Sequence, residues 1–147
     1  MTATYRLLIT GSRSWRDRVA VAGEIGEAAG IALARGLELV VVHGDAPEGA
    51  DAIAEEICRQ QGIHTDRHPA LWQVHGWRRA GIMRNTEMVA AGADMAAAFA
   101  LPCAKPECAE LPAHPTHGTS HCAETAARAG VAVTRIGPGW QQEARAA

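Results

Sequence analysis

The apolar run LVVV at residues 39–42 constrains the fold more than any other part of the sequence. A continuous apolar run of this kind is typical of a strand that is buried on both faces, as the strands of a parallel sheet are. The run is followed by Gly44 and Asp45, and a helical pattern begins at Asp51. We therefore predict a buried strand that leads through a short loop into a helix.

Strand-like and helix-like segments alternate along the rest of the chain. Helical spacing with suitable end residues predicts the helices, and short apolar runs predict the strands. The alternation predicts an α/β fold, a three-layer Rossmann-like sandwich around a mainly parallel sheet of about five strands. The predicted strands cover residues 5–10, 39–42, 63–68, 94–100 and 131–136, and the predicted helices cover residues 17–34, 51–61, 76–91 and 119–129.

The length of 147 residues and the composition indicate one domain. We predict that this domain covers residues 1–137, with an irregular Cys- and His-rich loop at 101–118 and a loose tail at 138–147. The formal net charge of -2 gives no basic surface for DNA or RNA, so no nucleic-acid partner is expected. No apolar run approaches the ~20 residues of a membrane span, and no signal peptide is evident. We expect a cytoplasmic protein with no membrane partner.

Glycine and polar residues follow the predicted strands at their carboxyl ends, where sheets of this type bind ligands. Backbone N–H groups at such turns and at helix N-termini can bind phosphate, and an Arg can add a bidentate contact. The alternatives are an ordinary turn, an exposed Arg, and a simple helix N-cap at Thr119 or Ser120. The residues predicted to contact an anion are Gly11, Ser12, Arg13, Arg84, Asn85, Gly118 and Thr119.

The loop after the second predicted strand, GDAPEGAD, is rich in both glycine and acidic residues. It lacks the Lys of a Walker loop, so a nucleoside triphosphate with Mg²⁺ is not the expected ligand. A carboxylate beside a glycine turn can accept hydrogen bonds from ribose hydroxyls, and we assign this role to Asp45, with Gly44 and Gly49 in the same ligand-binding loop. Asp51 is predicted to be the N-cap of the next helix. A capped loop without a ligand is the alternative.

Thiols and imidazoles are concentrated between residues 103 and 122. Cys103 and Cys108, together with His114 and His117, have the residue types of a tetrahedral zinc site. Cys122 is an alternative ligand, since the segment contains more candidates than such a site has places. A structural zinc ion would order a segment that has little apolar content of its own. Reduced surface thiols in a His-rich loop are the alternative.

The motifs GSRSW, VVHGDAPEGAD, HPALW, AGIMRN and HGTSHC occur in this order along the chain. Their order resembles the YspA/YpsA-related branch of the SLOG superfamily over about residues 5 to 136. Relatives of that branch are the cytokinin-activating "lonely guy" phosphoribohydrolases and the DprA/Smf proteins. The resemblance implies a Rossmann-like fold, a nucleotide or nucleotide-derived ligand at the strand ends, and a homodimer. It implies no cofactor for ligand binding.

The phosphoribohydrolases carry an Arg on a Met-x-x-Arg-Lys helix, and Arg84 has the similar position here. Gly118 and Thr119 match part of their glycine-rich loop, whereas His121 stands two residues after the Thr, where they have a catalytic Glu. The resemblance leaves two functions open. The protein binds a phosphorylated nucleotide derivative as a sensor or sequestering module, or it hydrolyses the N-glycosidic bond of a nucleoside 5′-monophosphate. In the hydrolase, Arg84 would stabilise charge, and Asp45 or His121 would serve as acid or base. The missing Glu favours binding, and a zinc-stabilised interaction protein is a third alternative.

Overall fold

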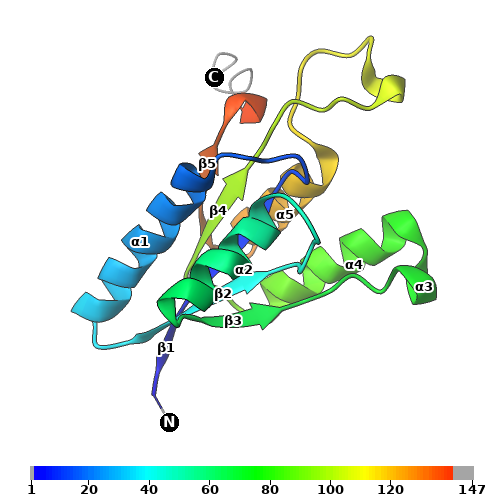
Figure 1. Ribbon diagram of the computed structural model, residues 1–147. Helices are drawn as coiled ribbons and strands as arrows, with labels where there is room; N and C mark the ends of the chain where they lie inside the picture. Colours follow the sequence, from blue (N-terminus) through cyan, green and yellow to red (C-terminus); the bar gives the residue numbers. More distant parts are fainter. Residues whose placement is uncertain (1, 141–147) are drawn as a thin grey trace.

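Five parallel strands form the central sheet of the computed structural model, which describes residues 2–140 (Figure 1). The strands are β1 (Thr4–Gly11), β2 (Glu38–His43), β3 (His64–Arg67), β4 (Met95–Phe99) and β5 (Ala132–Ile136). Their order across the sheet is β3-β2-β1-β4-β5, and every neighbouring pair is parallel. The predicted parallel sheet is confirmed.

Helices cover both faces of this sheet. They are α1 (Arg18–Ala34), α2 (Ala50–Gln61), the short α3 (Trp72–His75), α4 (Trp77–Ala90) and α5 (His117–Arg128), with two 3₁₀ helices, η1 (Pro106–Cys108) and η2 (Pro138–Trp140). Helices α1 and α2 pack on one face, whereas α4 and α5 pack on the other (Figure 1). The three-layer Rossmann-like arrangement is therefore confirmed. Within residues 2–140, no helix has the length and apolar character needed to cross a bilayer.

The two hydrophobic layers follow from the alternation of side chains along each strand. On β1, Leu7 and Ile9 pack against α1 and α2, and Leu8 between them packs against α4 and α5. On β2, Val41 and Val42 divide between the layers in the same way, and both are fully buried. The apolar run of the sequence is therefore a strand buried on both faces, as predicted.

The order of the strands reverses direction at β1. The chain places β2 and β3 on one side of β1, and β4 and β5 on its other side. Where the strand order reverses, the loops after the two neighbouring strands run in opposite directions. They leave a crevice at the carboxyl end of the sheet, where ligands bind in folds of this type. The loops after β1, β2 and β4, together with the first turn of α5, are called the ligand edge below.

The predicted cap of α2 is wrong. Gly49, not Asp51, is the N-cap, and it makes no side-chain cap hydrogen bond. Its φ of 82° and its contact with the backbone of Ser12 both require a residue without a side chain. Asp51 lies inside the first turn, where its carboxylate accepts a hydrogen bond from the Ala46 N–H at 3.2 Å. It therefore stabilises the preceding loop rather than the helix end.

Two other predicted helix boundaries differ from the structure. Helix α5 begins at His117 rather than at residue 119, because Thr116 occupies the N-cap position with an extended backbone. The predicted helix 76–91 begins at Trp77, and Gly76, with a φ of 77°, separates it from α3. Gly118, predicted to precede the helix, and Thr119, predicted to begin it, therefore both lie inside the first turn of α5.

The chain stays packed beyond the predicted end of the domain. Trp140 of η2 is 7% exposed, and its Nε1–H donates to the Ala98 carbonyl of β4 at 3.0 Å. The prediction of a loose tail is therefore wrong for Pro138–Trp140, because the Trp140 ring packs against the sheet at Ala98 and Ala100. The rest of the predicted tail, residues 141–147, lies outside the described residues.

Replacing Trp140 by Ala is expected to lower the free energy of unfolding by about 3 kcal/mol or more, because a large ring leaves the core. Trp140→Phe is expected to cost less, about 1 kcal/mol, because it loses mainly the hydrogen bond to Ala98. Urea denaturation followed by circular dichroism measures both values. An unchanged free energy in Trp140→Ala would support a loose tail instead.

Candidate functional site

Arg84 of α4 is fixed against the loop that follows β2. Its Nη1–H donates to the Gly44 carbonyl at 2.6 Å, and its Nε–H donates to Asn85 Oδ1 at 2.9 Å. A Cβ on Gly44 would collide with this guanidinium. The glycine is therefore needed for the close approach of Arg84 to the backbone. The structure brings together these two predicted ligand residues, which are 40 positions apart in the sequence.

Asn85 connects Arg84 to the first turn of α5. Because Arg can only donate, the Asn85 atom that accepts from it must be the oxygen, and Nδ2 is then the donor to its other partners. Nδ2 donates to the Gly118 carbonyl and to His121 Nδ1, both at 3.2 Å. Asn85 is itself buried. It therefore acts as a polar bridge between α4 and α5.

The same hydrogen bonds determine the tautomer of His121. Its Nδ1 accepts from Asn85, so the proton of the neutral ring is on Nε2. His121 then offers an N–H donor with its second nitrogen, not a free basic nitrogen. His121 therefore presents a hydrogen-bond donor at a position where an ionised carboxylate would present only acceptors.

Ser12 is buried, and its polar groups are bonded within the protein. Its N–H donates to the Phe99 carbonyl, and its hydroxyl oxygen accepts from the Leu101 N–H, both at 2.9 Å. Thr116 Oγ1 donates to Thr119 Oγ1 at 3.1 Å, so the 2.6 Å contact between Ser12 and Thr116 has Ser12 as the donor. The Ser12 hydroxyl and N–H therefore support the ligand edge from within, which leaves backbone amides and Arg side chains as the expected anion donors.

The first turn of α5 has the N–H groups of an uncapped helix start. Thr116, its N-cap, makes no side-chain cap hydrogen bond. The first N–H groups of a helix have no partner four residues earlier, and they carry the positive end of the helix dipole. The predicted anion contacts Gly118 and Thr119 lie in this turn.

The loop after β2 is supported from below by a histidine that the sequence reasoning did not select. His43 is fully buried, its Nδ1 accepts from the Asp45 N–H at 3.0 Å, and its Nε2 lies 2.9 Å from Glu55 Oε1. The ring is therefore protonated on Nε2 and donates to Glu55. Burial alone would raise the pKa of Glu55, but hydrogen bonds from His43, Thr65 and Arg59 outweigh it and lower that pKa. A polar residue directly after a buried apolar run was the only available signal.

Asp45 has an unusual backbone conformation at the exposed surface of this loop. Its φ of 54° is the only positive value of a non-glycine residue within residues 2–140. Asp tolerates the left-handed region better than most residues, and its bond to His43 holds it there. Its carboxylate is exposed, whereas burial raises the pKa of the nearby Asp51 carboxyl. Asp45 in the loop and Asp51 in the first turn of α2 thus have different environments.

Gly11 and Arg13 border the same edge from the side of β1. A Cβ on Gly11 would lie 2.5 Å from Ala50 Cβ, so glycine permits β1 and α2 to approach each other. Arg13 is exposed, and its guanidinium lies over the Trp72 ring, 5.3 Å from the centroid. Trp72 of α3 therefore borders the predicted anion residue Arg13.

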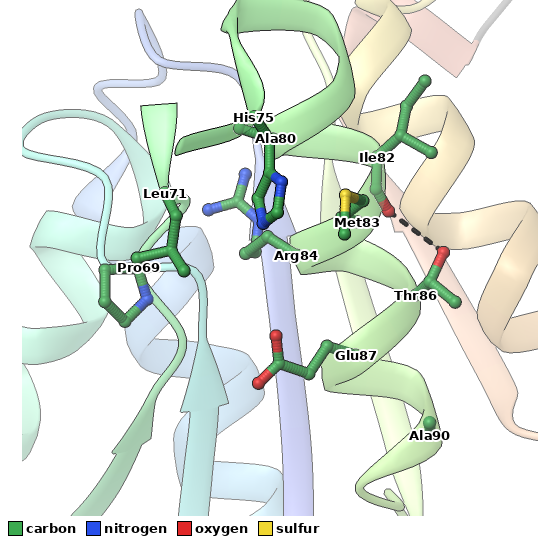
Figure 2. Close-up of a pocket in the computed structure, with 10 residues that line it drawn as sticks. All are labelled: Pro69, Leu71, His75, Ala80, Ile82, Met83, Arg84, Thr86, Glu87 and Ala90. Carbon is green, nitrogen blue, oxygen red and sulfur yellow. Dashed lines mark hydrogen bonds between the residues drawn. The ribbon is translucent and has the colours of Figure 1, made fainter. Parts of the chain in front are cut away.

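A shallow cleft of about 360 Å³ adjoins Arg84. Figure 2 shows Pro69 and Leu71 on one side of the cleft, with Arg84 and Glu87 extending from α4 on the other. The cleft is lined mostly by apolar groups, and its size is in the range of small-molecule sites. It provides apolar surface beside the cationic side chain.

Beyond the carboxyl end of β4, the chain forms an irregular segment that leads into α5, shown in yellow in Figure 1. Four side chains from this segment and from the first residue of α5 converge. This Cys/His cluster consists of Cys103, Cys108, His114 and His117, and its ligand atoms all lie within 4.8 Å of one another. His117 Nε2 lies 3.6 and 3.5 Å from the two sulfurs and 3.1 Å from His114 Nε2. Tetrahedral zinc, with bonds of about 2.3 Å to S and 2.0–2.1 Å to N, separates its ligands by about 3.3–3.8 Å.

A backbone carbonyl next to the cluster orients one of its imidazoles for binding a cation. His114 Nδ1 lies 2.7 Å from the Pro112 carbonyl, which can only accept, so the proton is on Nδ1 and the Nε2 lone pair faces the cluster. The predicted set of four residues could therefore hold a metal ion. The alternative ligand Cys122 is wrong, because it is fully buried against the sheet with Leu8 and Val42. Burial raises the pKa of its thiol to about 11.

Comparison with known proteins gives two matches. A family model, described as the YspA, cpYpsA-related SLOG family, matches residues 5–75. The Gene 61 protein of Mycobacterium phage D29 is 41% identical over 138 residues, which are 90% of this chain and 96% of that protein. No solved structure matches the chain. The family model covers the loops after β1 and β2, and the similarity to the phage protein extends over most of the chain.

Gly44→Ala is expected to lower the free energy of unfolding by about 1 kcal/mol, because its Cβ displaces the flexible end of Arg84 and removes the hydrogen bond to the Gly44 carbonyl. Gly23→Ala is the matched control. A Cβ on Gly23, in the interior of α1, meets nothing within 4 Å. This change is expected to stabilise the protein by about 0.5–1 kcal/mol through helix propensity. Thermal and urea denaturation of both variants measure the two effects, and equal values would contradict the close Gly44–Arg84 contact.

Proposed function

The chain belongs to the YspA, cpYpsA-related SLOG family, and we propose that it binds a phosphorylated nucleotide or nucleotide derivative at the ligand edge. The observation that carries this proposal is the hydrogen-bonded connection from the Gly44 loop through Arg84 and Asn85 to the first turn of α5. This connection links the Arg84 guanidinium to the N-terminus of α5 by hydrogen bonds, at the carboxyl end of the sheet where the strand order reverses. Both are donors suited to an anion.

The phosphate is assigned to Arg84, to the first-turn amides at Gly118 and Thr119, and to the exposed Arg13. A guanidinium has more N–H donors than the two bonds that Arg84 makes within the protein. His121 supplies a further N–H donor through Nε2. All these groups donate, as recognition of a phosphate requires.

The sugar is assigned to the loop after β2. The exposed carboxylate of Asp45 can accept hydrogen bonds from ribose hydroxyls, which donate. Its bond to the buried His43 fixes the backbone before a ligand arrives, and this lowers the entropy cost of binding. The apolar cleft beside Arg84 offers a surface for a base.

The alternative function is hydrolysis of the N-glycosidic bond, in which Arg84 would stabilise charge and Asp45 or His121 would serve as acid or base. We prefer binding because the residue at the position of the catalytic Glu is His121, whose accepting nitrogen is already bonded to Asn85. A neutral ring held as a donor at Nε2 stabilises an anion. It does not replace a carboxylate in activating water.

The test is titration with a panel of nucleoside 5′-monophosphates and ribose 5-phosphate, followed by calorimetry. Arg84→Ala is expected to weaken binding about tenfold or more, because a charge-assisted contact to phosphate is lost. Arg128→Ala is the control, since it removes the same charge from the exposed carboxyl end of α5. Release of free base by the unmodified protein would favour the hydrolase. Equal affinities of the two variants would contradict the assigned phosphate site.

We also propose that the ion of the Cys/His cluster is zinc with a structural role. A set of two thiolates and two imidazoles favours Zn²⁺ over harder cations. Four protein ligands leave no open position, which is the usual difference between a structural and a catalytic zinc site. Residues 104–113 form only η1 and are mostly exposed, so packing contributes little to their order.

Protein purified without an affinity tag is expected to contain about one equivalent of zinc by mass spectrometry of the metals. Cys108→Ser is expected to lose most of it, because one thiolate ligand is removed. Glu107→Gln, at an exposed neighbouring position of η1, is expected to keep it. A fully folded protein that contains no metal and gains none from added zinc would refute this proposal.

A further inference from the structure

The residue that begins α5 lies between two members of the Cys/His cluster. Thr116 is the N-cap of α5, His114 precedes it by two positions, and His117 is the first residue of the helix. An ion bound to both imidazoles therefore closes a small loop around the cap residue. The position of the first turn of α5 and the geometry of the cluster cannot change independently.

Thr116 also bonds to the two loops of the ligand edge that come from β1 and β4. Its N–H donates to the Leu101 carbonyl at 3.1 Å, and its hydroxyl bonds to Ser12 Oγ at 2.6 Å and to Thr119 at 3.1 Å. Through Ser12 the connection reaches the carbonyl of Phe99 at the end of β4. One residue thus joins the cluster to the centre of the sheet.

The first turn of α5 is also linked to Arg84, through Asn85. The Gly118 carbonyl accepts from Asn85, and Asn85 accepts from Arg84. Displacing the first turn of α5 would therefore alter both its own N–H donors and the support of the guanidinium. These are the groups to which the phosphate has been assigned.

Few other contacts hold the entrance to α5. Residues 101–103 and 114–116 are joined by a bridge between Pro102 and Pro115 and by the bond from the Cys103 N–H to the His114 carbonyl, at 2.7 Å. Between them, residues 104–113 are exposed except for Cys108. Metal coordination would add a cross-link through side chains to these backbone contacts, and it would also include Cys108 in the middle of the segment.

We propose that metal binding at the Cys/His cluster fixes the first turn of α5 and thereby sets the affinity of the ligand edge for phosphate, with Thr116 as the positioning residue between the two sites. The proposal rests on the zinc ion and the phosphate site proposed above. It makes zinc a structural cofactor of ligand binding: the ion touches no ligand, and its removal weakens binding through Thr116, Gly118 and Asn85.

The first experiment measures hydrogen exchange in zinc-loaded and chelator-treated protein, using peptides that cover residues 117–122, with α1 as the internal control. Removal of zinc is expected to speed exchange of the hydrogen-bonded amides at residues 120–122 about tenfold or more and to leave α1 unchanged. This readout needs no ligand. Equal exchange in the two forms overturns the proposal even if the phosphate site is correct.

The second experiment titrates both forms with ribose 5-phosphate, the part common to the nucleoside 5′-monophosphates, and follows NMR shifts. The affinity is expected to fall about fivefold or more without zinc. If neither form binds the probe while exchange still depends on zinc, the proposed phosphate site fails and the metal control of α5 stands. If both forms bind equally, metal control of affinity is overturned and the phosphate site stands.

Variants separate the coupling from simple unfolding. Thr116→Val keeps all four metal ligands but removes the hydroxyl, so it is expected to retain zinc while exchange in α5 rises and affinity falls. Thr116→Ser restores the hydroxyl and is expected to restore both values. Glu107→Gln is the matched control in the same segment. If Thr116→Val retains zinc and leaves both values unchanged, Thr116 is not the positioning residue.

Discussion

The contact between the Arg84 guanidinium and the Gly44 carbonyl is the interaction on which the ligand edge depends. It joins helix α4 on one face of the sheet to the loop that leaves β2. It exists only because residue 44 has no side chain. With Asn85 beside it, the same arginine is linked to α5, so three elements share one polar centre. The hydrogen bonds within this centre also fix the orientation of Asn85 and the tautomer of His121.

The fold and the Cys/His cluster could be predicted from sequence because both depend on local patterns. The apolar run at 39–42 and the alternation of elements identify the sheet, and four closely spaced Cys and His residues identify the cluster. The roles of Ser12, His43 and Thr116 could not be predicted in this way. They depend on hydrogen bonds to residues that are distant in the chain, such as the bond between Ser12 and Thr116 across 104 positions.

The errors have the same origin. Asp51 has the residue type and position of a helix cap, but the backbone at Gly49 must pass close to Ser12, and this moves the cap to the glycine. Cys122 follows the cluster closely in sequence, but a helix turns its side chain toward the sheet. Trp140 lies in a segment with few apolar neighbours in sequence, and its partner, the Ala98 carbonyl, is on β4. In each case a tertiary contact outweighs a local preference.

The acidic residues of the loop GDAPEGAD indicate which part of a ligand this loop would contact. Asp51 is buried and accepts a hydrogen bond from the Ala46 amide, so it is positioned to bond within the protein rather than with a ligand, and its burial raises the pKa of its carboxyl. Asp45, directly after the Gly44 that Arg84 contacts, has an exposed carboxylate, whereas Arg84, Arg13 and the first turn of α5 are the proposed donors. A ligand that matches this edge needs an anionic group and, beside it, hydroxyl groups that donate. A sugar phosphate has both, and inorganic phosphate has no hydroxyl-bearing carbon frame to reach Asp45.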